Sequence, residues 1–142
     1  MENIKLYDIL VCEDIRTEIG GQHTIVGLVS ELNVNVGKDH KGDVVIPLSF
    51  MIRLTDLKES IELKDFIVDI YDDNKKIIST KVTIEENQRI QKHFNIAIIK
   101  QIIKLDESTK LHFEIKATDK NGKIHTISNN YQFIIHLLRN VK

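Results

Sequence analysis

Hydrophobic and polar residues alternate along most of this chain with a period of two. In residues 44–54, VVIPLSFMIRL, one parity is entirely apolar, whereas the other includes Pro47, Ser49 and Arg53. Because successive side chains of a β-strand point to opposite faces, this period predicts strands with one buried and one solvent-facing side. The same alternation recurs in residues 65–73, 93–99 and 111–118. The pattern places four phenylalanines in the core: Phe50, Phe66, Phe94 and Phe113.

Two turns are expected to join neighbouring strands as hairpins. Asp119-Lys120-Asn121-Gly122 contains Asn-Gly, which tolerates the positive φ of a tight turn, between strands predicted near 111–119 and 122–128. Asp72-Asp73-Asn74-Lys75 connects two further runs less tightly, because it has no glycine. We therefore predict one all-β domain over residues 1–142: an antiparallel two-sheet sandwich, Ig-like or C2-like, with eight or nine strands and at most one short helix.

Two places depart from simple alternation. Pro47 cannot donate a ladder hydrogen bond, so its strand is expected to be an edge strand or to carry a bulge there. Residues 99–105 continue an isoleucine-rich stretch in which apolar residues also recur at helical spacing, so a short helix and a bulged strand both remain open.

Charge and cysteine content narrow the classes of partner. The 142 residues include 20 basic and 21 acidic ones, a net charge of -1, so the chain lacks the positive field that binds nucleic acid or an anionic membrane. The lone cysteine, Cys12, excludes an intrachain disulfide and lies on an apolar strand beside Glu13 and Asp14, which raise its pKa and indicate a core thiol. With no signal-like or membrane-length apolar run, we expect a soluble, cytoplasmic protein.

Gly20-Gly21-Gln22-His23 resembles the Gly-Gly-Gln loop of peptide-chain release factors, which would imply ester hydrolysis. The flanking residues differ from that family, because Glu18-Ile19 precede the motif and an apolar run follows it. The alternative is a chain reversal that leads into a strand over residues 24–29, with Gly27 as a bulge or a close-packing point.

Acidic residues at the hairpin tips suggest one candidate metal site. Asp72, Asp73 and Asp119 could converge at one end of a sandwich and bind calcium, as in a calcium-dependent C2-like module. Aspartate is also an ordinary turn residue, and Lys75 and Lys120 lie beside these carboxylates, which favours hairpin chemistry. No metal or cofactor is assigned on this basis.

Histidines provide a second candidate site. His112 and Glu114 share one strand face, and His125 lies on the strand expected to pair with theirs, so a zinc-like or hydrolytic cluster is geometrically possible. The same face also carries Lys116 and Thr118, however, which is the pattern of a solvated surface. No catalytic residue is assigned.

The last strand, YQFIIHLLRN, carries apolar residues on both faces. If residues 131, 133, 135 and 137 point inward, then Ile134, His136 and Leu138 form a partly apolar outer face. Such a face predicts a surface for a partner protein, although a loop could equally cover it.

The opening segment, LYDILVCEDIRTEIGGQHTIVGLVSEL, is similar to the start of a family of small uncharacterised bacterial and phage proteins. Cys12-Glu13, Gly21-Gln22 and Gly27 match its strand, turn and glycine-containing strand, and the later hairpins DIYDDNKKI and FEIKATDKNGK follow its course. The resemblance implies a compact β-sandwich with no assigned activity and no catalytic residue.

These observations predict a non-catalytic binding or interaction protein. Its partner is expected to be a protein, either a second copy or another chain, in the setting of a phage or mobile element. Two alternatives remain: the calcium-dependent module, and a small hydrolase that uses the histidine face or the Gly-Gly-Gln loop.

Overall fold

The computed structural model describes residues 4–20, 22–37, 39–56, 62–84 and 93–139. All regular secondary structure within these residues is β-strand. The ten strands are β1 (Ile4–Thr17), β2 (His23–Val29), β3 (Leu32–Val36), β4 (Val44–Asp56), β5 (Leu63–Asp72), β6 (Lys75–Thr83), β7 (His93–Leu105), β8 (Thr109–Asp119), β9 (Ile124–Ile127) and β10 (Gln132–Arg139). None of the described residues belongs to a helix long and apolar enough to cross a membrane.

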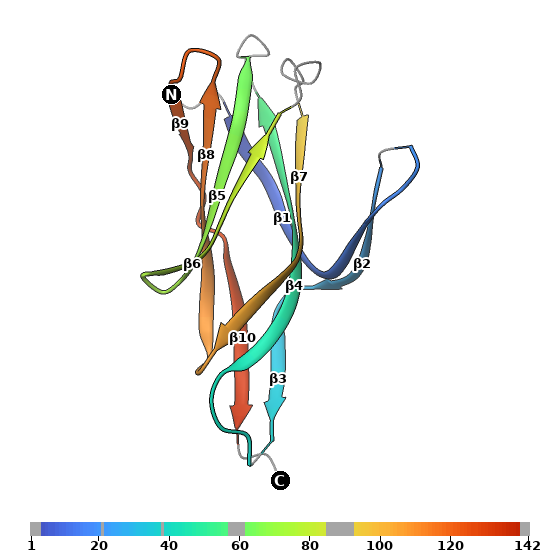
Figure 1. Cartoon of the computed structure of the whole chain (residues 1–142), viewed down its shortest axis with the longest axis vertical. Helices are drawn as coiled ribbons and strands as arrows, with labels where there is room; N and C mark the ends of the chain where they lie inside the picture. Colours follow the sequence, from blue (N-terminus) through green and yellow to red (C-terminus); the bar gives the residue numbers. More distant parts are fainter. Residues whose placement is uncertain (1–3, 21, 38, 57–61, 85–92, 140–142) are drawn as a thin grey trace.

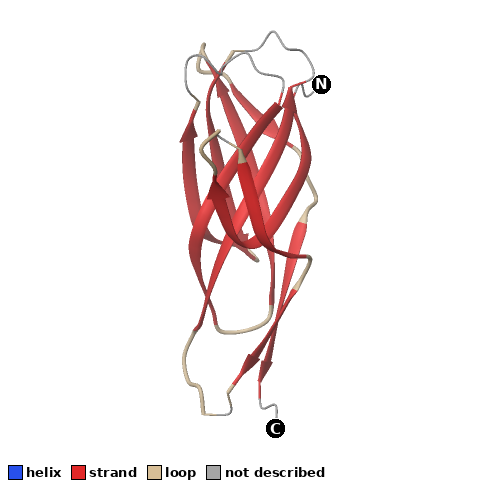
Figure 2. Cartoon of the chain, turned by 90° about the vertical axis from the view of Figure 1, so that its right-hand side faces the viewer, coloured by secondary structure: helices blue, strands red, loops and turns tan. Residues whose placement is uncertain are grey.

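The strands form two sheets that pack face to face (Figures 1 and 2). One sheet has four strands in the order β2-β1-β4-β7, and the other has the order β3-β10-β8-β5-β6, with β9 also paired to β8. One edge of β8 pairs with β5. The other edge is shared by two strands: β9 pairs with residues 115–118 of β8, and β10 pairs with residues 109–112. The predicted all-β two-sheet sandwich is confirmed.

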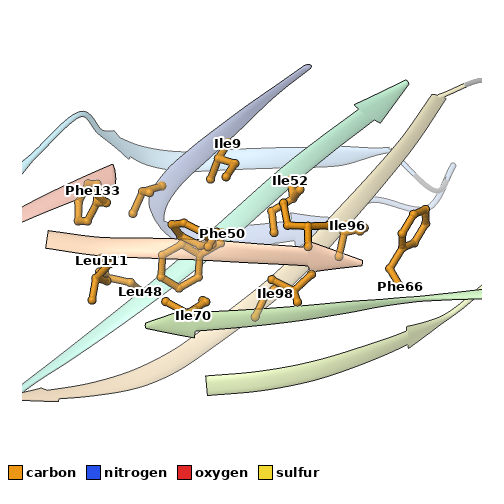
Figure 3. Close-up of a cluster of buried hydrophobic side chains, with 14 of the residues drawn as sticks. Ile9, Leu48, Phe50, Ile52, Phe66, Ile70, Ile96, Ile98, Leu111 and Phe133 are labelled. Atoms are coloured by element: carbon orange, nitrogen blue, oxygen red, sulfur yellow. The ribbon is translucent and has the colours of Figure 1, made fainter. Parts of the chain in front are cut away.

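The main core lies between the sheets and contains the apolar parity of each strand (Figure 3). The four phenylalanines predicted to be buried are at most 6% exposed. They meet edge to face across the two sheets, Phe50 with Phe113 at a centroid distance of 5.5 Å and Phe66 with Phe94 at 5.3 Å. Aromatic pairs of this geometry stabilise the folded protein by more than the burial of their apolar surface alone. They therefore help to fix how the two sheets face each other.

Both predicted hairpins are present. β5 and β6 pair up to Asp72 and Lys75, and Asp73 in the turn has a φ of 52°. β8 and β9 are joined through Gly122, whose φ is 83°, as the Asn-Gly turn requires. Residues 99–105 are part of β7 rather than a helix, and the irregularity there is a bulge at Lys100, with a φ of 51°.

The structure differs from the expected sandwich in two details. It has ten described strands rather than eight or nine, because only two residues separate β2 from β3 and the pattern does not distinguish one strand from two. In addition, β3 pairs with β10 in parallel, so the sandwich is not wholly antiparallel. Alternation reports which face a side chain occupies, but it carries no information about strand direction.

Among the described residues, β7 is the one strand that pairs with β4 at Pro47, since the pairing between β1 and β4 begins at Ser49. The register between β4 and β7 also shifts between Leu48 and Phe50. The strand therefore has a free edge at Pro47 and a bulge close by, as a residue without an N–H donor requires.

Candidate functional site

The β1–β2 hairpin changes direction at Gly27. The two strands pair on both sides of this point, but Glu13 and Gly27 form no regular pair, and Gly27 has a φ of 69°. In Figure 1 the outer part of the hairpin turns away from the two sheets. This positive φ favours glycine, and a Cβ atom at Gly27 would lie 2.7 Å from Cδ of Glu13, so any other residue would also displace the Glu13 side chain.

The change of direction alters which side chains share a face. In a regular strand Cys12 and Ile15 would point to opposite faces, because they are three residues apart. Both instead lie in one small buried cluster with Met51, separate from the main core. Met51 alternates with Phe50 and Ile52, which face the main core, so this second cluster lies on the outer face of the four-stranded sheet.

An open groove of about 400 Å³ lies beside this cluster. Its lining, which we call the hairpin groove, consists of Leu10, Gln22, His23, Ile25, Met51, Arg53 and Asn95. Leu10 and Met51 are directly paired across β1 and β4 and share a face, and Ile25 packs against the same cluster from β2. These three side chains give the groove an aliphatic base.

The next cross-strand row supplies polar groups. Asp8, Arg53 and Asn95 lie opposite one another on β1, β4 and β7. Arg53 Nε donates to Asp8 Oδ1 at 2.6 Å, and Nη2 donates to Asp8 Oδ2. This two-bond ion pair holds the guanidinium in place and cancels its charge.

Gln22 and His23 come from the reversal between β1 and β2. The turn is closed by Glu18 N, which donates to Gln22 O at 2.8 Å, and by Thr24 Oγ1, which donates to Glu18 Oε1 at 2.9 Å. The residues of the Gly-Gly-Gln resemblance therefore form a chain reversal that leads into β2, although Gly21 lies outside the described residues. Two of them nevertheless line the groove.

Histidine–hydroxyl contacts occur twice near this site, at 3.4 Å between His23 Nδ1 and Thr17 Oγ1 and at 3.3 Å between His93 Nδ1 and Thr55 Oγ1. Both contacts are long and exposed. Among the described residues no third group orients either imidazole, whereas nucleophilic catalysis relies on a base positioned by such a group. Neither contact has the geometry of a catalytic pair.

The acidic residues proposed from the sequence as calcium ligands are not brought together. Asp72 lies opposite Leu111 and Asp119 lies opposite Leu63, so they are at opposite ends of the β5–β8 pair, about 25 Å apart at the rise of a strand. Asp72 accepts a hydrogen bond from Thr109, and Asp73 is the exposed turn residue between β5 and β6. Among the described residues no three acidic, histidine or cysteine side chains are grouped as metal ligands.

Asp119 instead organises the β8–β9 turn. Its Oδ1 accepts hydrogen bonds from the backbone N–H groups of Asn121 and Lys123 at 2.9 and 3.0 Å, and its Oδ2 lies 3.0 Å from His125 Nε2. The hydrogen bond with His125, followed by those with the backbone, lowers the pKa of Asp119. This is the hairpin role that the sequence favoured.

The histidine face does not assemble into a cluster either. His112 stacks on Tyr71 with a centroid distance of 5.3 Å, and Glu114 pairs with Lys116 at 2.9 Å, which lowers the pKa of Glu114. His125 lies opposite the buried Ala117 and therefore on the other face of β8. His112 and Glu114 occupy a charged outer face, and His125 belongs to the turn.

The predicted partner surface on β10 has mixed exposure. Ile134 and His136 are half-buried, and Leu138 is 42% exposed. His136 Nε2 lies 3.7 Å from Glu31 Oε2, and Ile134 and His136 line a shallow hollow with Asp73 and Lys110. The structure places these residues on one outer face, and their role as a partner surface stays a prediction.

Cys12 is the buried thiol expected from the sequence. It is 0% exposed, its Sγ donates to Ser49 O at 3.6 Å, and burial together with the nearby Asp14 raises its pKa. Sequence reasoning missed the groove beside it. In the sequence, Arg53 and Asn95 look like ordinary solvent-facing strand positions. The one local feature that pointed to an irregularity here was Gly27 inside an apolar strand.

Comparison with known proteins supports the fold alone. No family model and no curated protein sequence matches the chain, so the family resemblance of the opening segment has no support beyond its fold. A solved structure, the C-terminal domain of Wzt, is similar over 99% of this chain and 77% of its own length, with a TM-score of 0.51 and 12% identical residues. At this identity the likeness shows that the two chains share a β-rich fold.

Proposed function

We propose that this chain is a non-catalytic binding domain and that its ligand occupies the hairpin groove. The observation that carries the proposal is the combination in one concave site of an aliphatic base with a few oriented polar groups. Binding sites for small molecules and short segments have this composition, and about 400 Å³ falls within their usual range of volume.

The construction of the site also supports binding. The hairpin changes direction at Gly27, which adopts a positive φ, and a β-branched or bulky residue rarely adopts this conformation. The direction of the hairpin is therefore specified by the sequence, as is the ion pair that positions Arg53. A shared fold with the C-terminal domain of Wzt does not specify function, so the ligand has to be argued from the groove itself.

A titration of isotope-labelled protein with a library of small neutral fragments, followed by NMR of the backbone amides, tests this proposal. We expect binding fragments to shift the amide signals of Leu10, Ile25, Met51 and Asn95 more than those of the opposite sheet. Asn95→Trp substitutes an exposed residue, should fill the groove without disturbing the core, and should abolish these shifts.

Two further variants form a matched pair. Ile25→Arg places a long charged side chain in the groove, whereas Ile124→Arg makes the same change at a 60% exposed position on β9. Fragment binding should be lost in the first variant and kept in the second. Fragments that shift no groove amide, or that bind equally to Ile25→Arg and Asn95→Trp proteins with native-like spectra, would falsify the proposal.

A further inference from the structure

The turn between β8 and β9 carries the one Asn-Gly pair in the sequence, Asn121-Gly122. An asparagine side chain loses ammonia when the backbone nitrogen of the next residue attacks its carboxamide carbon. Glycine leaves that nitrogen open to attack, because it has no Cβ and permits close approach of the backbone. Asn130, by contrast, precedes Tyr131, whose side chain shields the nitrogen. The sequence therefore makes Asn121 the asparagine most prone to this reaction.

The reacting groups are accessible in the folded protein. Asn121 and Gly122 are both exposed. Among the described residues, the carboxamide of Asn121 has no hydrogen-bond partner, and only its backbone N–H is bound. The carboxamide carbon is thus free to approach the nitrogen of the adjacent residue, and groups held this close react far faster than separate molecules.

The turn nevertheless restrains the attacking nitrogen. Gly122 N donates to Asp119 O at 3.0 Å, and this hydrogen bond has to break before the nitrogen attacks. Asp119 Oδ1 also accepts hydrogen bonds from the N–H groups of Asn121 and Lys123 at 2.9 and 3.0 Å, which hold the flanking peptide groups in place. One intramolecular hydrogen bond changes an equilibrium by about two- to tenfold, so the folded turn should slow the reaction by about this factor or more.

We infer that Asn121 is a site of spontaneous deamidation and that the hydrogen bonds of Asp119 set its rate. Gly122 N bonds to Cγ of Asn121, and its proton passes through water to Nδ2. The Cγ–Nδ2 bond then breaks, ammonia leaves, and a cyclic imide remains. Water opens the imide at either of its carbonyl carbons and yields aspartate or isoaspartate. In the net reaction, one water is consumed, one ammonia is released and the amide becomes a carboxylate.

Both products disturb the turn that joins β8 and β9. The new carboxylate is a like charge close to Asp119, which already binds the N–H of residue 121. Isoaspartate also adds one carbon atom to the main chain between Asp119 and Lys123, whose N and O are joined by a hydrogen bond of 2.9 Å. Among the described strands, β8 is the one that pairs with β9, so a turn that no longer fits loosens β9 first.

The test is incubation of the full chain at mildly alkaline pH, followed by mass spectrometry of its proteolytic peptides. In the folded protein Asn121 should deamidate faster than Asn130, which is also exposed. In concentrated urea Asn121 should react about two- to tenfold faster or more, because Asp119 O no longer holds the nitrogen. Asp119→Ala should raise the rate in the folded protein and leave it unchanged in urea. The control Thr126→Ala, at an exposed position of β9, should change neither rate.

Hydrogen exchange of the separated products tests the consequence for β9. The amides of residues 124–127 should exchange faster in the isoaspartate protein than in Asn121→Asp, which carries the same charge on an unaltered main chain. The amides of β5 should exchange equally in both proteins.

Four results would overturn the inference. Three concern the reaction: equal rates at Asn121 and Asn130 in the folded protein, equal rates at Asn121 in the folded and unfolded chains, and an effect of Asp119→Ala that persists in urea. The fourth is unchanged exchange of β9 in the isoaspartate protein.

Discussion

Replacement of Gly27 by alanine should be the most informative single change in this protein. An L-residue in the left-handed region costs about 1–2 kcal/mol, because its Cβ approaches the carbonyl oxygen. The new Cβ would also lie 2.7–2.8 Å from Cγ, Cδ and Oε2 of Glu13, so that side chain has to move. Since Glu13 is exposed and can rotate, most of the cost comes from the backbone.

We therefore expect Gly27→Ala to lower the free energy of unfolding by about 1–2 kcal/mol, and the melting temperature by about 3–8 °C for a domain of this size. Gly27→Asn should cost less, because asparagine tolerates positive φ better than other residues with a side chain. Gly27→Val should cost most and should open or straighten the hairpin, so that neutral fragments no longer bind the groove.

A double-mutant cycle separates the backbone cost from the contact with Glu13. It compares urea denaturation of the natural protein, Gly27→Ala, Glu13→Ala and the double variant. If the contact with Glu13 contributes, Gly27→Ala will be less destabilising in the Glu13→Ala background, by an interaction energy of about 0.5 kcal/mol. The remaining loss reports the backbone. A Gly27→Ala protein as stable as the natural one, or a Gly27→Val protein that still binds fragments, would refute the role assigned to this glycine.

Three further predictions concern stability and reactivity. The pKa of Asp119 is lowered by His125, so the stability that this carboxylate contributes is present above its unfolded pKa of about 3.9 and is lost as the pH falls through the folded value. The difference in urea stability between the natural protein and Asp119→Ala should therefore shrink below about pH 4. A difference that grows there would contradict this prediction. Phe50→Ala should cost about 3–5 kcal/mol in chemical denaturation, since Phe50 is 0% exposed and packs against Phe113, and a loss below about 1 kcal/mol would show that the two sheets do not meet there. Cys12 should react with a thiol reagent only as fast as the protein opens, because it is buried and its pKa is raised, so fast labelling of the folded protein would contradict its position.

Alternation along the chain identified most of the fold, because it is a local property that the pleat of a strand imposes on every second side chain. The inward residues of β4, β5, β7 and β8 follow from it, and the hairpin at Gly122 follows from turn chemistry that involves only four neighbouring residues. The charged outer face around Glu114 and the buried thiol of Cys12 were predicted for the same local reasons.

The hairpin groove had no local signature. Gly27 could be recognised as a possible bulge, but not as the point where Ile15 moves to the same face as Cys12. Gly27 lies beside Glu13 across the strand pair, and the cluster that Ile15 joins is completed by Met51, which is 36 residues further along the chain than Ile15. Arg53 and Asn95 become part of a site only because three strands place them in one row with Asp8.

The sequence by itself thus determined the inward parity of the main core strands, the two hairpins at Asp73 and Gly122, and that the molecule is a β-sandwich. Tertiary structure alone decided that β3 runs parallel to β10, that Asp72 and Asp119 lie at opposite ends of one strand pair, and that the first hairpin bends to form a groove. The physical reason is range: burial and turn preference act between near neighbours, whereas strand order, register and the shape of a site depend on contacts between residues far apart in the chain.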